Sequence, residues 1–241
     1  MLLLIDAGNT RVKWALAQAG AAAGHWLAHG AVPHAALDTL PRAWQGQHVA
    51  RVLVSNVAGA ALRERLAALL PVAPEWFAST ASLAGLVNGY RNPAQLGCDR
   101  FAAALGARTL EPGRALVVAT CGTATTIDAV SADGVFVGGM ILPGLALMAA
   151  SLARNTAQLP HIAESGAARA GFADNTDDAI LAGCLSAQAG AIERAFGLLG
   201  AELCMLSGGA ARYIAPSLAA PHRMVDNIVL VGLHAAATWK E

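Results

Sequence analysis

Two apolar segments of this chain, separated by 114 positions (Gly8 falls on Gly122), end in the same kind of tight polar turn. Residues 2–10 read LLLIDAGNT, and residues 116–124 read LVVATCGTA. The period is much longer than that of a solenoid repeat. We therefore expect two copies of one α/β unit, each opening with a buried strand. Two facing turns rich in backbone N–H groups and hydroxyls would hold a polyphosphate, which favours an enzyme that moves a phosphoryl group.

The order of predicted elements supports a duplication, because strand-strand-strand-helix-strand-helix occurs twice. Residues 82–95 are predicted to be a loop, 160–165 extended or loop, and 111–113 a linker between domains at 1–112 and 113–241. Alternation and apolar runs predict strands at 2–6, 11–17, 25–30, 51–55, 75–78, 115–119, 124–130, 134–138 and 202–206. Helices are predicted at 36–44, 60–70, 99–109, 145–154, 177–199 and 228–239, the last packing back on the first domain.

Composition narrows the class of protein. Hydrophobic residues make up 56% and charged residues 13%, so a large core is possible and little disorder is expected. The formal net charge is +0 and no basic-aromatic stretch occurs, which disfavours nucleic acid as a partner. The four cysteines lack C-x-x-C spacing, so we expect reduced thiols in a cytoplasmic protein. We expect no signal peptide and no membrane span.

The first turn combines a carboxylate with donors that suit phosphate. Asp6 ends a predicted central strand, at the edge where α/β sheets place ligands. A carboxylate there repels phosphate unless a cation lies between them, and Mg²⁺ is the natural cation. Gly8 permits close backbone approach, Asn9 and Thr10 add donors, and Lys13 adds positive charge. The alternative is an ordinary hairpin with an Asp/Gly/Asn turn.

The second turn, residues 122–126, carries uncharged donors that suit a second phosphate loop. The alternative is a Thr-rich strand on a sheet surface. Ser207, Gly208 and Gly209 follow another predicted strand, and the two glycines leave room for a flat group such as adenine. A Gly-Gly turn between strand and helix is common, so this segment alone is weak evidence.

Residues 97–100, which read GCDR, open a predicted helix. Asp99 is either an N-cap or a base that accepts the proton of an attacking hydroxyl. In the second case Arg100 would hold the anionic end of the acceptor, and Tyr90 could line the same pocket.

Together these segments resemble the type III pantothenate kinases, of the acetate kinase/sugar kinase/Hsp70/actin-like superfamily. The matching segments occur in family order along almost the whole chain. They are DAGNT at 6–10 with Lys13, GCDR at 97–100, GTATTID at 122–128, GGMILPG at 138–144 and SGG at 207–209. The resemblance implies α/β architecture with duplicated actin-like (ribonuclease H-like) domains, mixed central sheets and a nucleotide cleft between the domains.

The resemblance also implies an activity and site residues. The activity is ATP-dependent phosphorylation of pantothenate to 4′-phosphopantothenate, the first step to coenzyme A. Asp99 would be the base, and Asp6 would lie near Mg²⁺. ATP would be bound by Asp6, Ala7, Gly8, Asn9, Thr10, Arg11, Val12, Lys13 and Thr123, with Ser207, Gly208 and Gly209 at the adenine. Pantothenate would be held by Tyr90, Gly97, Cys98, Asp99 and Arg100, and by Thr176 from across a homodimer interface.

The chain departs from the family pattern at Thr120, where the family usually has an Asp that serves K⁺ or NH₄⁺. We expect monovalent-cation activation to be weak or absent as a result. Two other functions stay open: a non-catalytic nucleotide-binding regulator of the Bvg accessory factor type, and a kinase of another small alcohol such as a sugar. An acceptor base at Asp99 favours a kinase, and the small size argues against a sugar kinase.

Overall fold

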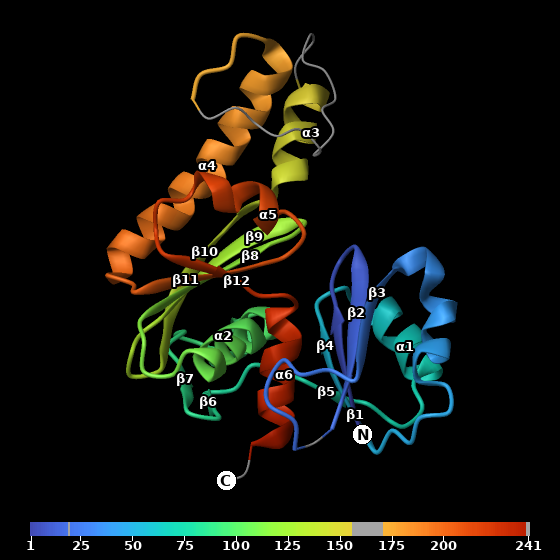
Figure 1. The fold of residues 1–241 in the computed structure, drawn as a ribbon. Helices are drawn as coiled ribbons and strands as arrows, with labels where there is room; N and C mark the ends of the chain where they lie inside the picture. The colour runs from blue at the N-terminus through green and yellow to red at the C-terminus, as the bar shows by residue number, and fades with distance from the viewer. Residues whose placement is uncertain (19, 156–170, 240–241) are drawn as a thin grey trace. The chain divides into compact units, whose positions relative to one another are not determined.

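The computed structural model describes residues 1–18, 20–155 and 171–239, and the chain divides into two compact units. Unit 1 comprises Met1–Gly113, Gly134–Val137 and Asn227–Glu241, and unit 2 comprises Arg114–Asp133 and Gly138–Asp226. Figure 1 labels the elements of both units. In the described part of the chain no helix is long and apolar enough to cross a membrane.

The elements of unit 1 are β1 (Leu2–Ala7), β2 (Arg11–Ala17), β3 (Ala28–Pro33), the 3₁₀ helix η1 (His34–Trp44), β4 (Arg51–Asn56), α1 (Ala60–Leu69), β5 (Glu75–Trp76), β6 (Ser82–Leu83), β7 (Leu86–Asn88), η2 (Pro93–Gln95), α2 (Cys98–Leu110) and α6 (Ile228–Thr238). Those of unit 2 are β8 (Leu116–Cys121), β9 (Ala124–Val130), α3 (Leu145–Asn155), α4 (Thr176–Leu199), β11 (Leu203–Ser207), α5 (Ala211–Ile214), η3 (Ala215–Ser217) and β12 (His222–Met224). Strand β10 (Val135–Pro143) begins in unit 1 and ends in unit 2.

The sheet of unit 1 has the order β3-β2-β1-β4-β5. Strand β1 runs antiparallel to β2 and parallel to β4, and every residue of β1 is buried. A strand covered on both faces needs a continuous apolar run, which residues 2–5 provide. Asp6 is the only polar residue of β1 and lies near its carboxyl end, so this end of the strand is a candidate position for a functional group.

The second sheet has the order β12-β11-β8-β9-β10-β7-β6, and its first five strands, read from β10 to β12, repeat the order of the first sheet. Strand β8 runs antiparallel to β9 and parallel to β11, as β1 does to β2 and β4. Asp6 lies opposite Ser55 in the first sheet, and Thr120 lies opposite Ser207 in the second. The repeated order and register confirm the duplicated α/β unit with mixed sheets that the sequence predicts, and they make Thr120 the counterpart of Asp6.

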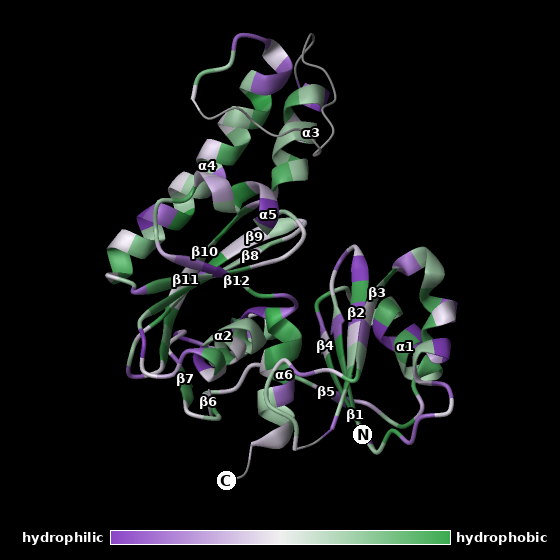
Figure 2. Ribbon diagram, in the orientation of Figure 1, coloured by the Kyte–Doolittle hydropathy of each residue, from purple (hydrophilic) through white to green (hydrophobic). Residues whose placement is uncertain are grey.

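Helices α2 and α6 lie side by side in unit 1 at a contact between glycines (Figure 1). A Cβ at Gly106 would collide with the carbonyl oxygen of Ile228 and lie 2.9 Å from the backbone nitrogen of Gly232. A Cβ at Gly232 would collide with the carbonyl oxygen of Ala102. The first seven residues of α6 are buried, and the upper half of α6 is mostly hydrophobic in Figure 2. The last helix thus packs against α2 within unit 1.

Several predicted boundaries are wrong. Residues 82–95 are not a plain loop, because they contain the β6/β7 hairpin and η2. The hairpin turns at Ala84 and Gly85, both with positive φ, and alanine is not a turn signal. Strand β10 runs on to Pro143 through Gly138 and Gly139, and residues 211–224 hold α5, η3 and β12, none of which was predicted. The prediction for 160–165 lies outside the described residues.

Candidate active site

Asp6 and Lys13 form a partly buried ion pair at the end of β1. The two residues face each other across β1 and β2, and the Lys13 Nζ lies 3.5 Å from the Asp6 carboxylate. Asp6 is only 6% exposed, and this burial raises its pKa; Asp99 raises it further, while Lys13 lowers it. A buried carboxylate that lies near a second carboxylate is suited to bind a divalent cation.

The turn after Asp6 is stabilised by a backbone hydrogen bond and by His34, which was not predicted from the sequence. The Gly8 N–H donates to the carbonyl of Arg11 at 3.1 Å, and His34 Nε2 lies 2.9 Å from the Gly8 carbonyl oxygen. His34 opens η1, so no local signal in the sequence links it to this turn. Asn9, Thr10 and Arg11 are exposed at the turn, whereas Ala7 and Val12 are buried in the sheet.

Asp99 is the second residue of α2, and Gly97 is the N-cap. The alternative that Asp99 itself caps the helix is therefore wrong. Its Oδ1 accepts a hydrogen bond from the Arg100 N–H at 2.8 Å. Burial raises the pKa of Asp99, and the hydrogen bond and charge of Arg100 oppose this only in part. The side chain is a carboxylate of increased basicity, which suits proton abstraction.

Arg100 joins the start of α2 to the loop that carries Tyr90. Its Nη1 donates to the Tyr90 hydroxyl at 2.8 Å, and the guanidinium carbon lies 5.7 Å and 5.8 Å from the ring centres of Tyr90 and Phe136. Arg100 is 7% exposed. The structure thus brings the predicted acceptor residues Tyr90, Asp99 and Arg100 into one cluster of unit 1.

Asn88 supports this cluster, although the sequence predicted only a loop over residues 82–95. It is 6% exposed, its Oδ1 accepts from the Tyr90 N–H at 3.1 Å, and its Nδ2 donates to the carbonyls of Thr80 and Pro93. Cys98 lies beside the cluster, half-buried, with its Sγ 3.4 Å from the hydroxyl oxygen of Ser55. A Cβ on Gly97 would lie 2.7 Å from Asp99 Oδ1, so a side chain at the N-cap would shift the Asp99 carboxylate.

The second turn, in unit 2, is built by close backbone packing. The Gly122 N–H donates to the carbonyl of Ala124 at 3.0 Å, and Thr123 is exposed at the tip. Gly208, with φ +94°, packs on the end of β8, where a Cβ would collide with the carbonyl of Cys121. Ser207 is buried, and Gly209 has open space around its Cα. The two Gly-rich segments of unit 2 therefore form one continuous backbone surface.

Thr120 brings a hydroxyl to the place that Asp6 occupies in unit 1. Among the described residues, Thr120 Oγ1 has no hydrogen-bond partner. Thr126 lies opposite Thr120, where Lys13 lies opposite Asp6. The ion pair of the first unit is thus replaced by hydroxyls in the second, and this turn carries no charge of its own at these positions.

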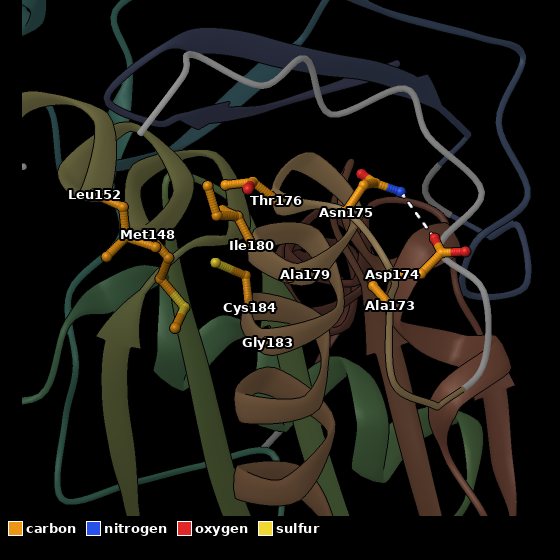
Figure 3. Close-up of a pocket in the computed structure, with 10 residues that line it drawn as sticks. All are labelled: Met148, Leu152, Ala173, Asp174, Asn175, Thr176, Ala179, Ile180, Gly183 and Cys184. Carbon is orange, nitrogen blue, oxygen red and sulfur yellow. Dashed lines mark hydrogen bonds between the residues drawn. The ribbon is translucent and has the colours of Figure 1, made fainter. Parts of the chain in front are cut away.

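Thr176 lies at the start of α4, away from the turns of unit 2 in sequence, and lines an open pocket of about 750 Å³ between α3 and α4. Asn175 caps α4, because its side-chain oxygen accepts from the Asp178 N–H at 3.0 Å. Figure 3 shows Met148 and Leu152 facing the α4 side chains across this pocket. Its walls are largely apolar and include Ile180 and Cys184.

Comparison with known proteins gives one consistent result. The family model for type III pantothenate kinase matches residues 2–197. A type III pantothenate kinase of Herminiimonas arsenicoxydans is 58% identical and covers 98% of this chain and 97% of its own length. That of Janthinobacterium sp. (strain Marseille) is 56% identical with the same coverage.

Solved structures agree on the fold. A Baf family protein from Campylobacter jejuni superposes with a TM-score of 0.64 at 21% identity, covering 96% of this chain and 94% of its own. The activator of 2-hydroxyisocaproyl-CoA dehydratase from Clostridium difficile gives 0.59 at 13% identity, covering 98% and 92%.

Proposed function

The chain belongs to the type III pantothenate kinase family, and on that premise we propose how its residues perform the family's reaction. The protein is a kinase that phosphorylates pantothenate with ATP, which is the committed entry to coenzyme A biosynthesis. The transferred group is the γ-phosphoryl group of ATP, and the acceptor is the 4′-hydroxyl of pantothenate. Phosphoryl transfer needs positioning and charge stabilisation more than covalent catalysis.

Asp99 takes the proton of the acceptor hydroxyl in this proposal. Its pKa is raised by burial, so the carboxylate is a better base than an ordinary exposed aspartate. Arg100 is oriented by its hydrogen bond to the Tyr90 hydroxyl and supplies the positive charge that attracts the carboxylate of pantothenate. The observation that carries the proposal is this arrangement of a basic carboxylate next to a buried, oriented arginine.

The two turns bind the phosphates of ATP. Residues 8–10 and Thr123 supply N–H and hydroxyl donors, and Lys13 supplies positive charge. The backbone surface at Ser207, Gly208 and Gly209 accepts the adenine ring. A Cβ on Gly209 would contact no other atom, and Gly208 packs closely against the backbone of Cys121 at the end of β8.

Mg²⁺ fits the residues present, because the Asp6 carboxylate is buried and the Lys13 Nζ lies 3.5 Å from it. Bound with ATP, Mg²⁺ would neutralise the charge that develops on the transferred group. Asp6 would hold the ion through water or directly, and Lys13 would share the phosphate charge.

A monovalent cation fits less well. The family pattern places a carboxylate at Thr120, and here Thr120 offers a hydroxyl oxygen that has no hydrogen-bond partner among the described residues. Hydroxyl oxygens can bind K⁺, but they lack the charge that makes the contact strong. We propose that activation by K⁺ or NH₄⁺ is weaker than in relatives that carry the carboxylate.

A homodimer is supported by the apolar surface of α3 and α4. Leu147 and Leu152 of α3 are exposed by 43% and 37%, beside the largely apolar pocket that Thr176 lines. Exposed apolar groups of this kind commonly mark subunit contacts. In a dimer, Thr176 would reach the pantothenate of the partner subunit. A cytoplasmic location stays a prediction from the free cysteines.

The alternative of a non-catalytic regulator is not favoured, because relatives that match nearly the whole chain are named as kinases. The test is a coupled assay of ADP release with pantothenate and a panel of other small alcohols, including sugars. Pantothenate-dependent turnover, lost in Asp99→Asn, supports the kinase. ATP binding without turnover on any acceptor would instead support a regulator.

A further inference from the structure

Gln188, in the middle of α4, is a fully buried polar side chain outside the residues discussed so far. Its Nε2 donates to the carbonyl oxygen of Pro143 at 2.7 Å and lies 3.0 Å from the sulfur of Met148. In the part of the chain that the structure describes, its Oε1 has no hydrogen-bond partner. A buried amide with an unpaired oxygen costs stability that leucine or methionine would not. The hydrogen bond to Pro143 is therefore the interaction that favours glutamine over leucine or methionine at this position.

The carbonyl that Gln188 binds belongs to a corner that supports the second turn. Gly144, the next residue, donates its N–H to the Thr123 carbonyl at 3.0 Å. Its carbonyl accepts from the Met148 N–H at 2.9 Å, which is the first hydrogen bond of α3. A Cβ on Gly144 would collide with the Gly122 carbonyl oxygen and lie 2.6 Å from that of Thr123. The corner and the turn are packed backbone to backbone, so the position of one fixes the position of the other.

We propose that Gln188 is a positioning residue that holds Thr123 and its neighbouring N–H groups in place for ATP, acting through Pro143 and Gly144. The inference rests on the proposed function in one respect, namely that ATP phosphates bind at this turn. A turn fixed before the ligand arrives loses less conformational entropy on binding. Because Met148 also lines the α3/α4 pocket, Gln188 contacts both the corner and the pocket wall.

The first test is Gln188→Met, which keeps the length and apolar bulk but removes the donor. We expect the KM for ATP to rise about tenfold, as for the loss of one buried hydrogen bond, while the KM for pantothenate stays within about twofold. The matched control is Ile192→Val, one turn along α4 and equally buried. It removes a methylene group and lowers stability without touching the corner, so its KM for ATP should not change.

The second test is Gln188→Glu, which separates positioning from general damage to the core. A buried carboxyl group has a raised pKa, and when protonated it can donate its O–H to the Pro143 carbonyl. The KM for ATP, taken as a ratio to wild type at each pH, should therefore be near one at acid pH and rise as the pH increases. The ratio for Gln188→Met should be high and independent of pH.

Measuring Thr123→Ala in parallel separates a failure of the positioning role from a failure of the proposed function. If both Thr123→Ala and Gln188→Met leave the KM for ATP unchanged, the assignment of ATP phosphates to this turn is overturned, and the inference with it. If Thr123→Ala raises that KM and Gln188→Met does not, only the positioning role is overturned. If Gln188→Met does not fold, the ratio for Gln188→Glu decides: a ratio that does not vary with pH contradicts the inference.

Discussion

Replacing Asp99 with asparagine isolates the chemical role of one carboxylate from its structural role. The Asp99 Oδ1 accepts from the Arg100 N–H at 2.8 Å, and an amide oxygen in the same place can accept this bond. Gly97 is the N-cap of α2, so the helix loses no cap. What the substitution removes is the ability to take a proton.

The expected loss of kcat is that of a general base, about 10²–10⁴-fold. At 1.36 kcal/mol per tenfold change, this corresponds to about 2.7–5.4 kcal/mol of transition-state stabilisation. The activity of the wild type should also fall at acid pH as Asp99 is protonated, and the midpoint should lie above the usual range for an aspartate, because burial raises its pKa.

We expect Asp99→Asn to preserve or raise stability at neutral pH while it lowers activity. Because the pKa of Asp99 is raised in the folded state, its contribution is fully present below the unfolded pKa and is lost as the pH rises through the folded pKa. At neutral pH the ionised carboxylate therefore costs stability, and Asp99→Asn is free of that cost. The Tm of the variant should equal or exceed that of the wild type at neutral pH, with the difference shrinking at acid pH.

The assay is pantothenate-dependent ADP release at saturating ATP, measured with thermal unfolding of both proteins from about pH 3 to about pH 8, a range that spans the ordinary and the raised pKa of an aspartate. Arg100→Lys serves as a companion that leaves the base in place. A kcat close to wild type in Asp99→Asn would refute the assignment of the base. A Tm several degrees lower at neutral pH would refute the electrostatic argument.

Three further predictions follow from the site. Asp6→Ala should raise the Mg²⁺ concentration needed for half-maximal rate, and an unchanged Mg²⁺ dependence at full activity would contradict the metal assignment. Light scattering should find a homodimer at assay concentrations, whereas an active monomer would remove the role of Thr176 from a partner subunit. Initial rates at constant ionic strength should rise less than tenfold, about 1.4 kcal/mol, on addition of K⁺ or NH₄⁺. The response should increase in Thr120→Asp, and a larger rise in the unchanged protein would show that an ion site exists without this carboxylate.

The two repeated strand ends could be predicted from the sequence. A strand buried on both faces must be apolar, so the single carboxylate at Asp6 and the hydroxyl at Thr120 stand out in the printed chain. Asp99 was identified with its role open, since only the structure places Gly97 at the cap. The predicted strand near 25–30 lies at Ala28–Pro33, because pairing with β2 rather than local pattern decides its ends.

The supporting residues could not be predicted, because their partners are distant in sequence. His34 reaches Gly8, and Gln188 reaches Pro143, and neither pair shares a local pattern. Asn88 lies in a segment predicted to be a loop, and its three hydrogen bonds join residues before and after the β6/β7 hairpin, whose strand β7 also pairs with β10. Short strands of this kind are specified by tertiary contacts more than by propensity.

The glycine contact between α2 and α6 has a consequence for the order of events during synthesis. Helix α2, which carries Asp99, has a buried face that is covered by a segment made more than a hundred residues later, where Gly106 meets Gly232. On the ribosome, α2 therefore keeps an apolar face exposed while unit 2, which lies between α2 and α6 in the sequence, is made. Folding of unit 1 is discontinuous in time, and α2 is covered only when α6 has emerged.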